Sequence, residues 1–314
     1  MTSQMLACLV SPFKPAAVFL FSPRDRDLLQ LLDRTPATPS LIVKASATFA
    51  GEPFRDERRA RERLQQLSHE RLIRAWSIGQ PGGGITKYYK LTPSGFSALH
   101  GEEVALPPRA FFSDIPLSRL EHSLLLADVI IHTLVAAKLH RVQVPKFHRE
   151  NELTLSVGQF VQQPDCHFQF VVSGKTFNVL FEVDRSTESV NSSAEQSVRQ
   201  KILGYEAYQD MVIEQWKESG RQWMRPLFRV AFLTLSVERA YHILRLAGSL
   251  SRNPTRLLCY ATTYDEFLGS SDAVREPLFL DHAGAWQSLV NLHPSSRFLR
   301  EPVRLPKEPS SQLF

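Results

Sequence analysis

The sequence predicts a two-domain α+β protein, in which a small domain of helices and one β-hairpin precedes a larger α/β domain with a mixed central sheet. Three observations predict this division. Helical periodicities and two β-like runs occupy most of residues 1–100, a proline-rich stretch without periodicity covers 101–116, and helix and strand patterns alternate over 117–290. Residues 291–314 lack any periodicity, so we expect an irregular tail there.

Composition and charge indicate a protein that binds a polyanion. The 314 residues are 43% hydrophobic, which is enough for a core in each domain, and the formal net charge is +5 with a pI near 9.2. The basic residues concentrate between Arg55 and Arg74. This uneven distribution favours a nucleic acid as the partner.

Cysteine usage and hydropathy predict a cytoplasmic protein. Cys8, Cys166 and Cys259 are far apart in apolar sequence, as expected of reduced core residues, and they have no zinc-site spacing. Lys14 and two prolines interrupt the apolar N-terminal runs, and no run reaches the length of a membrane span. We therefore expect neither a signal peptide nor a membrane partner.

The first domain begins with three helix patterns. Ser22-Pro23-Arg24-Asp25 is typical of a helix start, and a second short helix pattern follows Pro39. The third begins after Pro53, with Ala60, Leu64 and Leu67 on one face. The opposite face carries the residues that we expect to contact DNA: Arg55, Arg58 and Arg59 first, and Gln65 and Gln66 next.

Two β-like runs, 72–79 and 85–92, flank a glycine-rich turn and complete the pattern of a winged helix-turn-helix. In this fold the third helix enters the major groove and the wing lies along the backbone, so Lys87 and Tyr88 are expected to touch phosphate. Winged helices often read two half-sites, which favours a homodimer. Two alternatives stay open: the arginine face is simply solvated, or the domain mediates protein contacts.

The second domain is organised around the hairpin 164–188. A turn at Ser173-Gly174 sets Asp165 opposite Glu182, and strand alternation puts Asp184 on the same face as Glu182. Three carboxylates this close predict a cation among them, which is either a divalent ion such as Mg²⁺ or Mn²⁺ or a basic side chain. The alternative is an acidic strand end neutralised by Arg and Lys without chemistry.

The remaining elements predict layers of helices around this hairpin. An apolar helix over 117–140 should be buried against the sheet, with Glu121 and His122 in its first turns. His122 is expected to form a packing or hydrogen-bonded contact; the alternative is that the acid or the histidine at this place faces the carboxylate cluster. A helix over 194–218 carries Lys201, Tyr205 and Tyr208 on one face, and two further strands and two helices follow by residue 269.

The order of elements, with Pro164-Asp165 before one strand and Glu182 at the end of the next, resembles the PD-(D/E)XK nuclease fold. The usual lysine is replaced by Asp184. Over nearly the whole chain, the motifs YYKLTPSG, RLEHSLLLADV, QQPDCHFQF, FEVDRSTE, QKILGYEAY and RVAFLTLSVERA resemble the replication-relaxation family of plasmid and mobile-element proteins. The resemblance implies these characteristic core positions: Asp165, Glu182, Asp184, Arg185, Thr187, Lys201 and Tyr205.

Three functions are compatible with this pattern. The first is a DNA-binding protein of a plasmid or mobile element with a degenerate or variant nuclease-like core, which works beside other replication or mobilisation proteins. The second is an active Mg²⁺-dependent endonuclease or nickase, with Asp165, Glu182 and Lys201 catalytic and Asp165, Glu182 and Asp184 holding the metal. The third is a winged-helix transcription regulator with a small-molecule-sensing domain.

Overall fold

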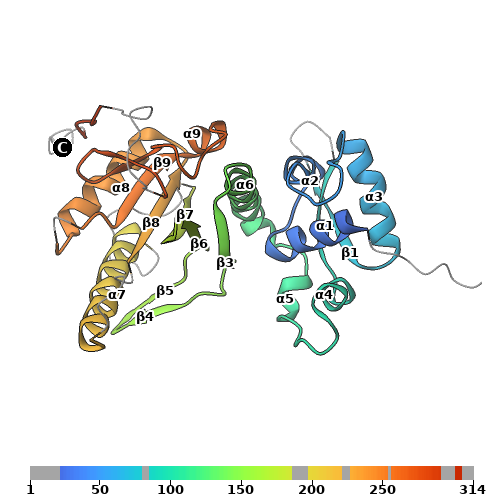
Figure 1. Ribbon diagram of the computed structural model, residues 1–314, viewed down its shortest axis with the longest axis horizontal. Helices are drawn as coiled ribbons and strands as arrows, with labels where there is room; N and C mark the ends of the chain where they lie inside the picture. Colours follow the sequence, from blue (N-terminus) through green and yellow to red (C-terminus); the bar gives the residue numbers. More distant parts are fainter. Residues whose placement is uncertain are drawn as a thin grey trace, which may run out of the picture.

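The computed structural model describes residues 22–79, 85–185, 197–220, 227–253, 256–290 and 301–305. Two bodies lie side by side along the longest axis of the molecule, and helix α6 (Leu117–Leu139) stands between them (Figure 1). One body is a winged helix and the other is an α/β core with a mixed sheet. The predicted α+β two-domain class is therefore confirmed.

The winged-helix domain consists of α1 (Pro23–Arg34), α2 (Pro39–Ser46), α3 (Glu57–His69), β1 (Ile73–Gly79), β2 (Ile85–Leu91) and α4 (Pro93–His100). Ser22 and Asp25 form a capping box at the start of α1, as predicted. Asp56 caps α3, so that helix begins at Glu57 and not directly after Pro53. The apolar faces of α1, α2 and α3 meet in one core that the hairpin closes.

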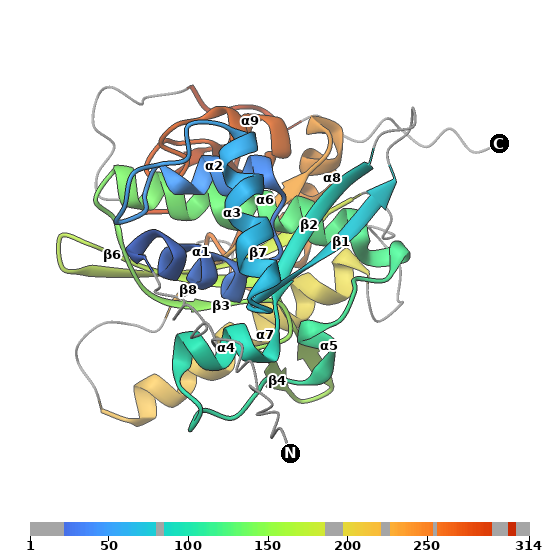
Figure 2. The same cartoon turned by 90° about the vertical axis from the view of Figure 1, so that its right-hand side faces the viewer.

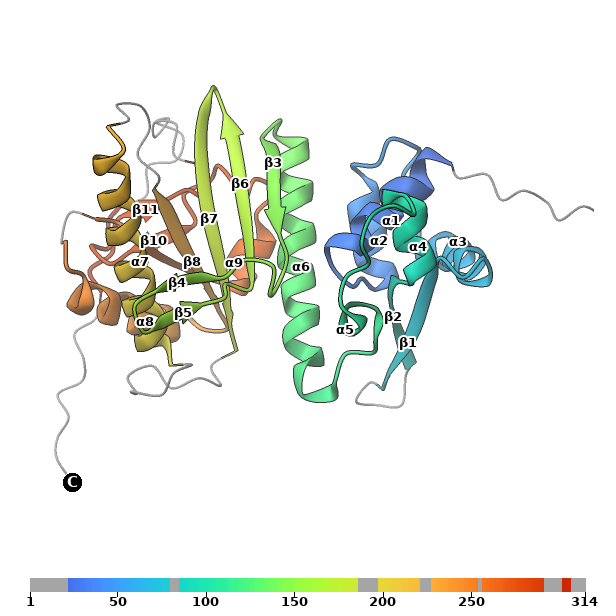
Figure 3. The ribbon, with the colours of Figure 1, turned by 90° about the horizontal axis from the view of Figure 1, so that it is seen from below.

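Helix α6 is buried from two sides, as Figure 3 shows. Ile131 belongs to the winged-helix core, whereas Val129 and Ile130 belong to the core of the α/β domain. Among the described helices, α6 has the length and hydropathy to cross a membrane, but 56% of its most apolar window is buried inside the protein. Its apolar surface is thus used for packing between the two domains.

The α/β core contains β3 (Gln143–His148), β4 (Leu155–Val157), β5 (Phe160–Gln162), β6 (Cys166–Val172), β7 (Lys175–Asp184), α7 (Val198–Glu218), β8 (Phe228–Thr234), α8 (Val237–Leu250), β9 (Cys259–Thr263), α9 (Tyr264–Gly269), β10 (Phe279–Asp281) and β11 (Trp286–Gln287). The described strands of the main sheet follow the order β11-β10-β9-β8-β7-β6-β3. Strands β7, β8 and β9 run parallel, and their flanking neighbours pair antiparallel. A mixed central sheet was predicted; the short strands β5, β10 and β11 were not.

The sheet separates two apolar layers. Phe181 and Val183 of β7 join the core beneath α6 and α9, while Leu180 joins the core beneath α7 and α8 (Figure 3). Because side chains alternate along a strand, Glu182 and Asp184 share the face of Leu180. These two carboxylates therefore lie under α7 and α8, at the carboxyl end of β7.

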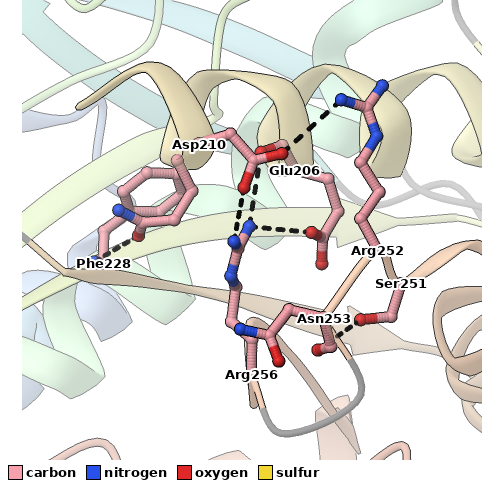
Figure 4. A network of polar contacts seen from close by, with 8 residues as sticks. Glu206, Asp210, Phe228, Ser251, Arg252, Asn253 and Arg256 are labelled. Carbon is pink, nitrogen blue, oxygen red and sulfur yellow. Dashed lines mark hydrogen bonds and ion pairs between the residues drawn. The ribbon is translucent and has the colours of Figure 1, made fainter. Parts of the chain in front are cut away.

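Helix α7 is held against this end of the sheet from two directions. On one flank it meets β5, where a Cβ on Gly204 would lie 2.2 Å from Gln162 Nε2, so the absent side chain permits the close approach. On the other flank Arg256 donates to Glu206 Oε2 at 2.9 Å and also contacts Asp210 (Figure 4). The side chains that α7 presents to β7 are therefore fixed in place.

Candidate nucleic-acid interface and carboxylate site

The third helix of the winged domain presents an exposed basic face. The side chains of Arg58 and Arg59 are 83% and 65% exposed, and Gln65 and Gln66 are also exposed. Helix α3 lies at the end of the molecule that faces away from the α/β core (Figure 2). Its outward surface is thus accessible to a long partner such as a duplex.

The ion pairs on the exposed face of α3 stay within the helix, whereas Arg63 of the same helix pairs with Asp25 of α1. Arg58 Nε and Arg59 Nη1 donate to the Glu62 carboxylate at 3.1 and 2.9 Å, and together they lower the pKa of that carboxyl. Arg61 pairs in the same way with Glu57. Exposed pairs of this kind contribute little to stability, so the guanidinium groups can exchange these acids for phosphate.

Three further residues of the predicted interface lie outside α3. Arg55 is exposed but precedes the Asp56 cap, so it stands before the helix and not on its face. Lys87 is exposed on β2, in the wing. The phosphate contact predicted for Tyr88 is wrong, because this side chain is only 1% exposed.

Tyr88 is buried because the segment before α6, which includes α5 (Arg109–Phe112), covers the second face of the hairpin. The Tyr88 hydroxyl donates to Asp114 and accepts from the Ile115 backbone N–H at 2.9 Å, and its ring stacks on Trp76 with 5.6 Å between centroids. Sequence alternation could not show that both faces of the wing are partly covered.

In the core, the hairpin register is the predicted one. Ser173 and Gly174 have positive φ values of 49° and 75°, and the pair Cys166–Phe181 sets Asp165 beside Glu182. The Asp165 backbone N–H donates to the Phe181 carbonyl at 3.1 Å, and the Val183 N–H donates to Asp165 Oδ2 at 2.6 Å. The second bond fixes the orientation of the Asp165 carboxylate.

Glu182 is buried and contacted from α7. Lys201 Nζ donates to Glu182 Oε2 over 3.0 Å, and the Tyr205 hydroxyl donates to Glu182 Oε1. Burial raises the pKa of the Glu182 carboxyl to about 7; the Lys201 ammonium opposes this shift and the Asp165 charge adds to it. The structure thus brings together Asp165, Glu182, Lys201 and Tyr205, whose roles stay predictions.

Asp184, which was predicted to be a metal ligand, has a different partner. Arg239 of α8 donates to both of its oxygens, at 2.5 and 3.0 Å, and the Asp184 side chain is 5% exposed. A buried carboxylate held by a guanidinium fork already has its counter-charge. The metal role of Asp184 stays a prediction, in which an ion would have to compete with Arg239. Arg185 pairs with Glu121 of α6, and Thr187 lies outside the described residues.

A second group of possible ligands lies on the other side of Asp165. His122 Nε2 of α6 is 3.1 Å from Asp165 Oδ1, and this contact raises the pKa of His122. One ligand atom each from His122, Glu150 and Asp165 lies within 4.8 Å of the others. Glu150 also pairs with Arg119. These residues fit a divalent metal better than the predicted set of Asp165, Glu182 and Asp184.

Sequence reasoning missed two residues around the carboxylates, Glu150 and Arg239. Glu150 lies in the turn after β3, and no periodicity marks it. Arg239 lies on α8 in the motif RVAFLTLSVERA, which was noted without a role for its arginine. An acid at the end of a buried strand, such as Asp184, indicates that a basic partner is needed. The partner, Arg239, lies 55 residues later, and spacing alone could not identify it.

Comparison with known proteins identifies the family. A family model described as Replication-relaxation matches residues 31–221, which is more than half of the chain. The match includes the winged helix from the end of α1 onward, together with β6, β7 and α7. The chain belongs to the replication-relaxation family. The resemblance to this family that the sequence motifs indicated is therefore confirmed. No protein of curated function matches it in sequence.

Among solved structures, this replication-relaxation protein is similar to PadR from Bacillus subtilis in complex with operator DNA, with 18% identity over 37% of this chain and 71% of that chain, at a TM-score of 0.22. It is also similar to the restriction endonuclease FokI bound to DNA, with 11% identity over 80% of this chain and 44% of that chain, at a TM-score of 0.27. It therefore spans under half of the FokI chain.

Proposed function

We propose that this protein binds duplex DNA through α3 and the β1–β2 wing, and that its nuclease-like core is a variant of the metal-dependent type. The observation that carries the proposal is the exposed face of α3, where two arginines and two glutamines project opposite a fully buried face. Arginine and glutamine suit phosphate and base edges respectively, and an α-helix fits the major groove.

The family supports the wider setting of this proposal. Replication-relaxation proteins are associated with plasmids and mobile elements, so we assign the protein to such an element, in the cytoplasm and beside other replication or mobilisation proteins. Lys87 would contact the DNA backbone from the wing, and Arg55 would do so from the loop before α3. The net charge of +5 is consistent with a polyanionic partner.

The double variant Arg58→Ala/Arg59→Ala tests the interface. We expect its affinity for a labelled duplex to fall at least about tenfold, with a salt-dependence slope smaller by about two, because two phosphate contacts are lost. Fluorescence anisotropy across a salt series measures both quantities. The matched control Lys138→Ala/Lys175→Ala removes two exposed charges outside the winged-helix domain, and its affinity for the duplex should be unchanged. Equal losses in both variants would show that charge alone, and not α3, binds DNA.

A second candidate function, metal-dependent nicking of DNA, is favoured by the contact between Lys201 and Glu182. In the usual E-x-K motif, the lysine follows the acid on the same strand. Here Lys201 of α7 contacts the acid, Glu182, instead. The ammonium supports the ionised form of the buried carboxylate, and Tyr205 orients it. Asp165 directly precedes the adjacent strand β6. A divalent metal, when bound, would supply Lewis-acid activation of water and of the scissile phosphate.

Supercoiled plasmid distinguishes this candidate from a non-catalytic core. With Mg²⁺ or Mn²⁺ we expect nicked circles from the unaltered chain and at least about a hundredfold slower nicking by Asp165→Asn and by Lys201→Met, while DNA affinity is retained. Agarose gels measure the nicking rate, with Lys138→Ala/Lys175→Ala as the control. If the unaltered chain makes no nicks with either ion, the core is a DNA-binding platform and the first proposal stands alone.

A further inference from the structure

The carboxylate site has two sides with different chemistry. On the α7 side, Glu182 already accepts from Lys201 and Tyr205, and Asp184 already accepts from Arg239. A metal there would have to compete with two cations. On the α6 side, Asp165 faces an imidazole and a second carboxylate. The metal assignment made from the sequence, which used the α7 side, carries this competition and stays a prediction.

We infer that His122, Glu150 and Asp165 form the metal site of this protein, and that this site prefers a first-row transition ion such as Mn²⁺ to Mg²⁺. The inference deepens the second candidate function by naming its metal ligands, and it rests on that function only for its catalytic consequence. Metal binding itself is measured without DNA.

Geometry supports the site. The three ligand atoms lie within 4.8 Å of one another, and Nε2 of His122 is 3.1 Å from Oδ1 of Asp165. Ligands that share one ion at bond lengths of about 2.0–2.2 Å stand roughly 3–4 Å apart. Small side-chain rotations therefore close this group around an ion, and no backbone has to move.

The surroundings of each ligand support the same assignment. The Val183 N–H holds Oδ2 of Asp165, which leaves Oδ1 directed at His122, as an outer-shell hydrogen bond does in metal sites. His122 comes from the rigid helix α6. Among the described residues, Arg119 pairs with Glu150, and the Arg119 side chain is 55% exposed, so it can move into solvent.

The donor set favours a transition ion. Mg²⁺ prefers oxygen ligands and retains several waters, whereas an imidazole nitrogen beside carboxylates suits Mn²⁺, Fe²⁺, Co²⁺ or Zn²⁺. Three protein ligands leave coordination positions for water or a phosphate oxygen.

Manganese binding to the full chain, without DNA, tests the inference. We expect one Mn²⁺ per chain by electron paramagnetic resonance titration, with spin-echo modulation from a directly bound imidazole nitrogen. His122→Ala should abolish that modulation and weaken binding at least about tenfold, and Glu150→Gln should also weaken binding at least about tenfold. Mg²⁺ at equal concentration should displace little of the bound Mn²⁺.

The control Glu121→Gln removes the neighbouring acid of α6, which pairs with Arg185 and not with the group, so its Mn²⁺ affinity should be unchanged. Circular dichroism of each variant verifies folding, and His122→Gln provides a milder replacement if His122→Ala unfolds. The inference is overturned if the chain binds no Mn²⁺, or if Glu182→Gln weakens binding while His122→Ala does not. Neither result bears on DNA affinity, so the two proposals fail independently.

Discussion

Replacing Arg239 with Met is expected to destabilise the α/β core by about 3–5 kcal/mol. The Arg239 guanidinium donates twice to Asp184, and the two side chains are only 12% and 5% exposed. Without the guanidinium, a carboxylate buried under α8 loses the charge that neutralises it. Urea denaturation followed by circular dichroism measures the loss in free energy of unfolding.

Two further variants isolate the cause of this loss. Asp184→Leu/Arg239→Met removes both charges, and it should recover most of the lost stability because a buried ion pair exchanged for apolar side chains is often neutral. Arg58→Met breaks an exposed pair on α3, and it should cost less than about 1 kcal/mol. A loss below about 1 kcal/mol for Arg239→Met would contradict the structural role and favour the metal role of Asp184.

Replacing Arg256 with Met should cost about 3 kcal/mol near neutral pH. Arg256 binds Glu206, which is 2% exposed, and Asp210, one turn further along α7 (Figure 4). Burial raises the pKa of Glu206, and the Arg256 charge opposes that shift. The variant should therefore raise the pKa of Glu206 further and loosen the helix that carries Lys201.

The pH dependence of this loss has a definite sign. A carboxyl whose pKa is raised in the folded state binds more protons there than in the unfolded chain, so its contribution to stability falls as pH rises. Arg256→Met should thus be less destabilising at about pH 5 than at about pH 7.5, where Glu206 must ionise without the guanidinium. Urea denaturation at both pH values tests this, and a loss that does not change with pH would exclude Glu206 as its source.

Local chemistry explains why part of the site was predictable. The turn at Ser173-Gly174 sets the hairpin register, and the register alone places Asp165 beside Glu182. The exposed face of α3 likewise follows from helical periodicity. Contacts between distant segments are harder to predict. The contact of His122 with Asp165, across 43 residues, was only an alternative, and that of Arg239 with Asp184, across 55 residues, was not predicted. The burial of Tyr88 also depends on a segment that arrives from elsewhere in the fold.

Helix α6 belongs to the cores of both domains. Ile131 packs in the winged-helix core, and Val129 and Ile130 pack in the core of the α/β domain. Dividing the chain at residue 116 would remove α6 from the winged-helix domain and expose the apolar surface against which Ile131 packs. A displacement of the winged-helix domain would thus be passed to α6, the helix that also carries His122.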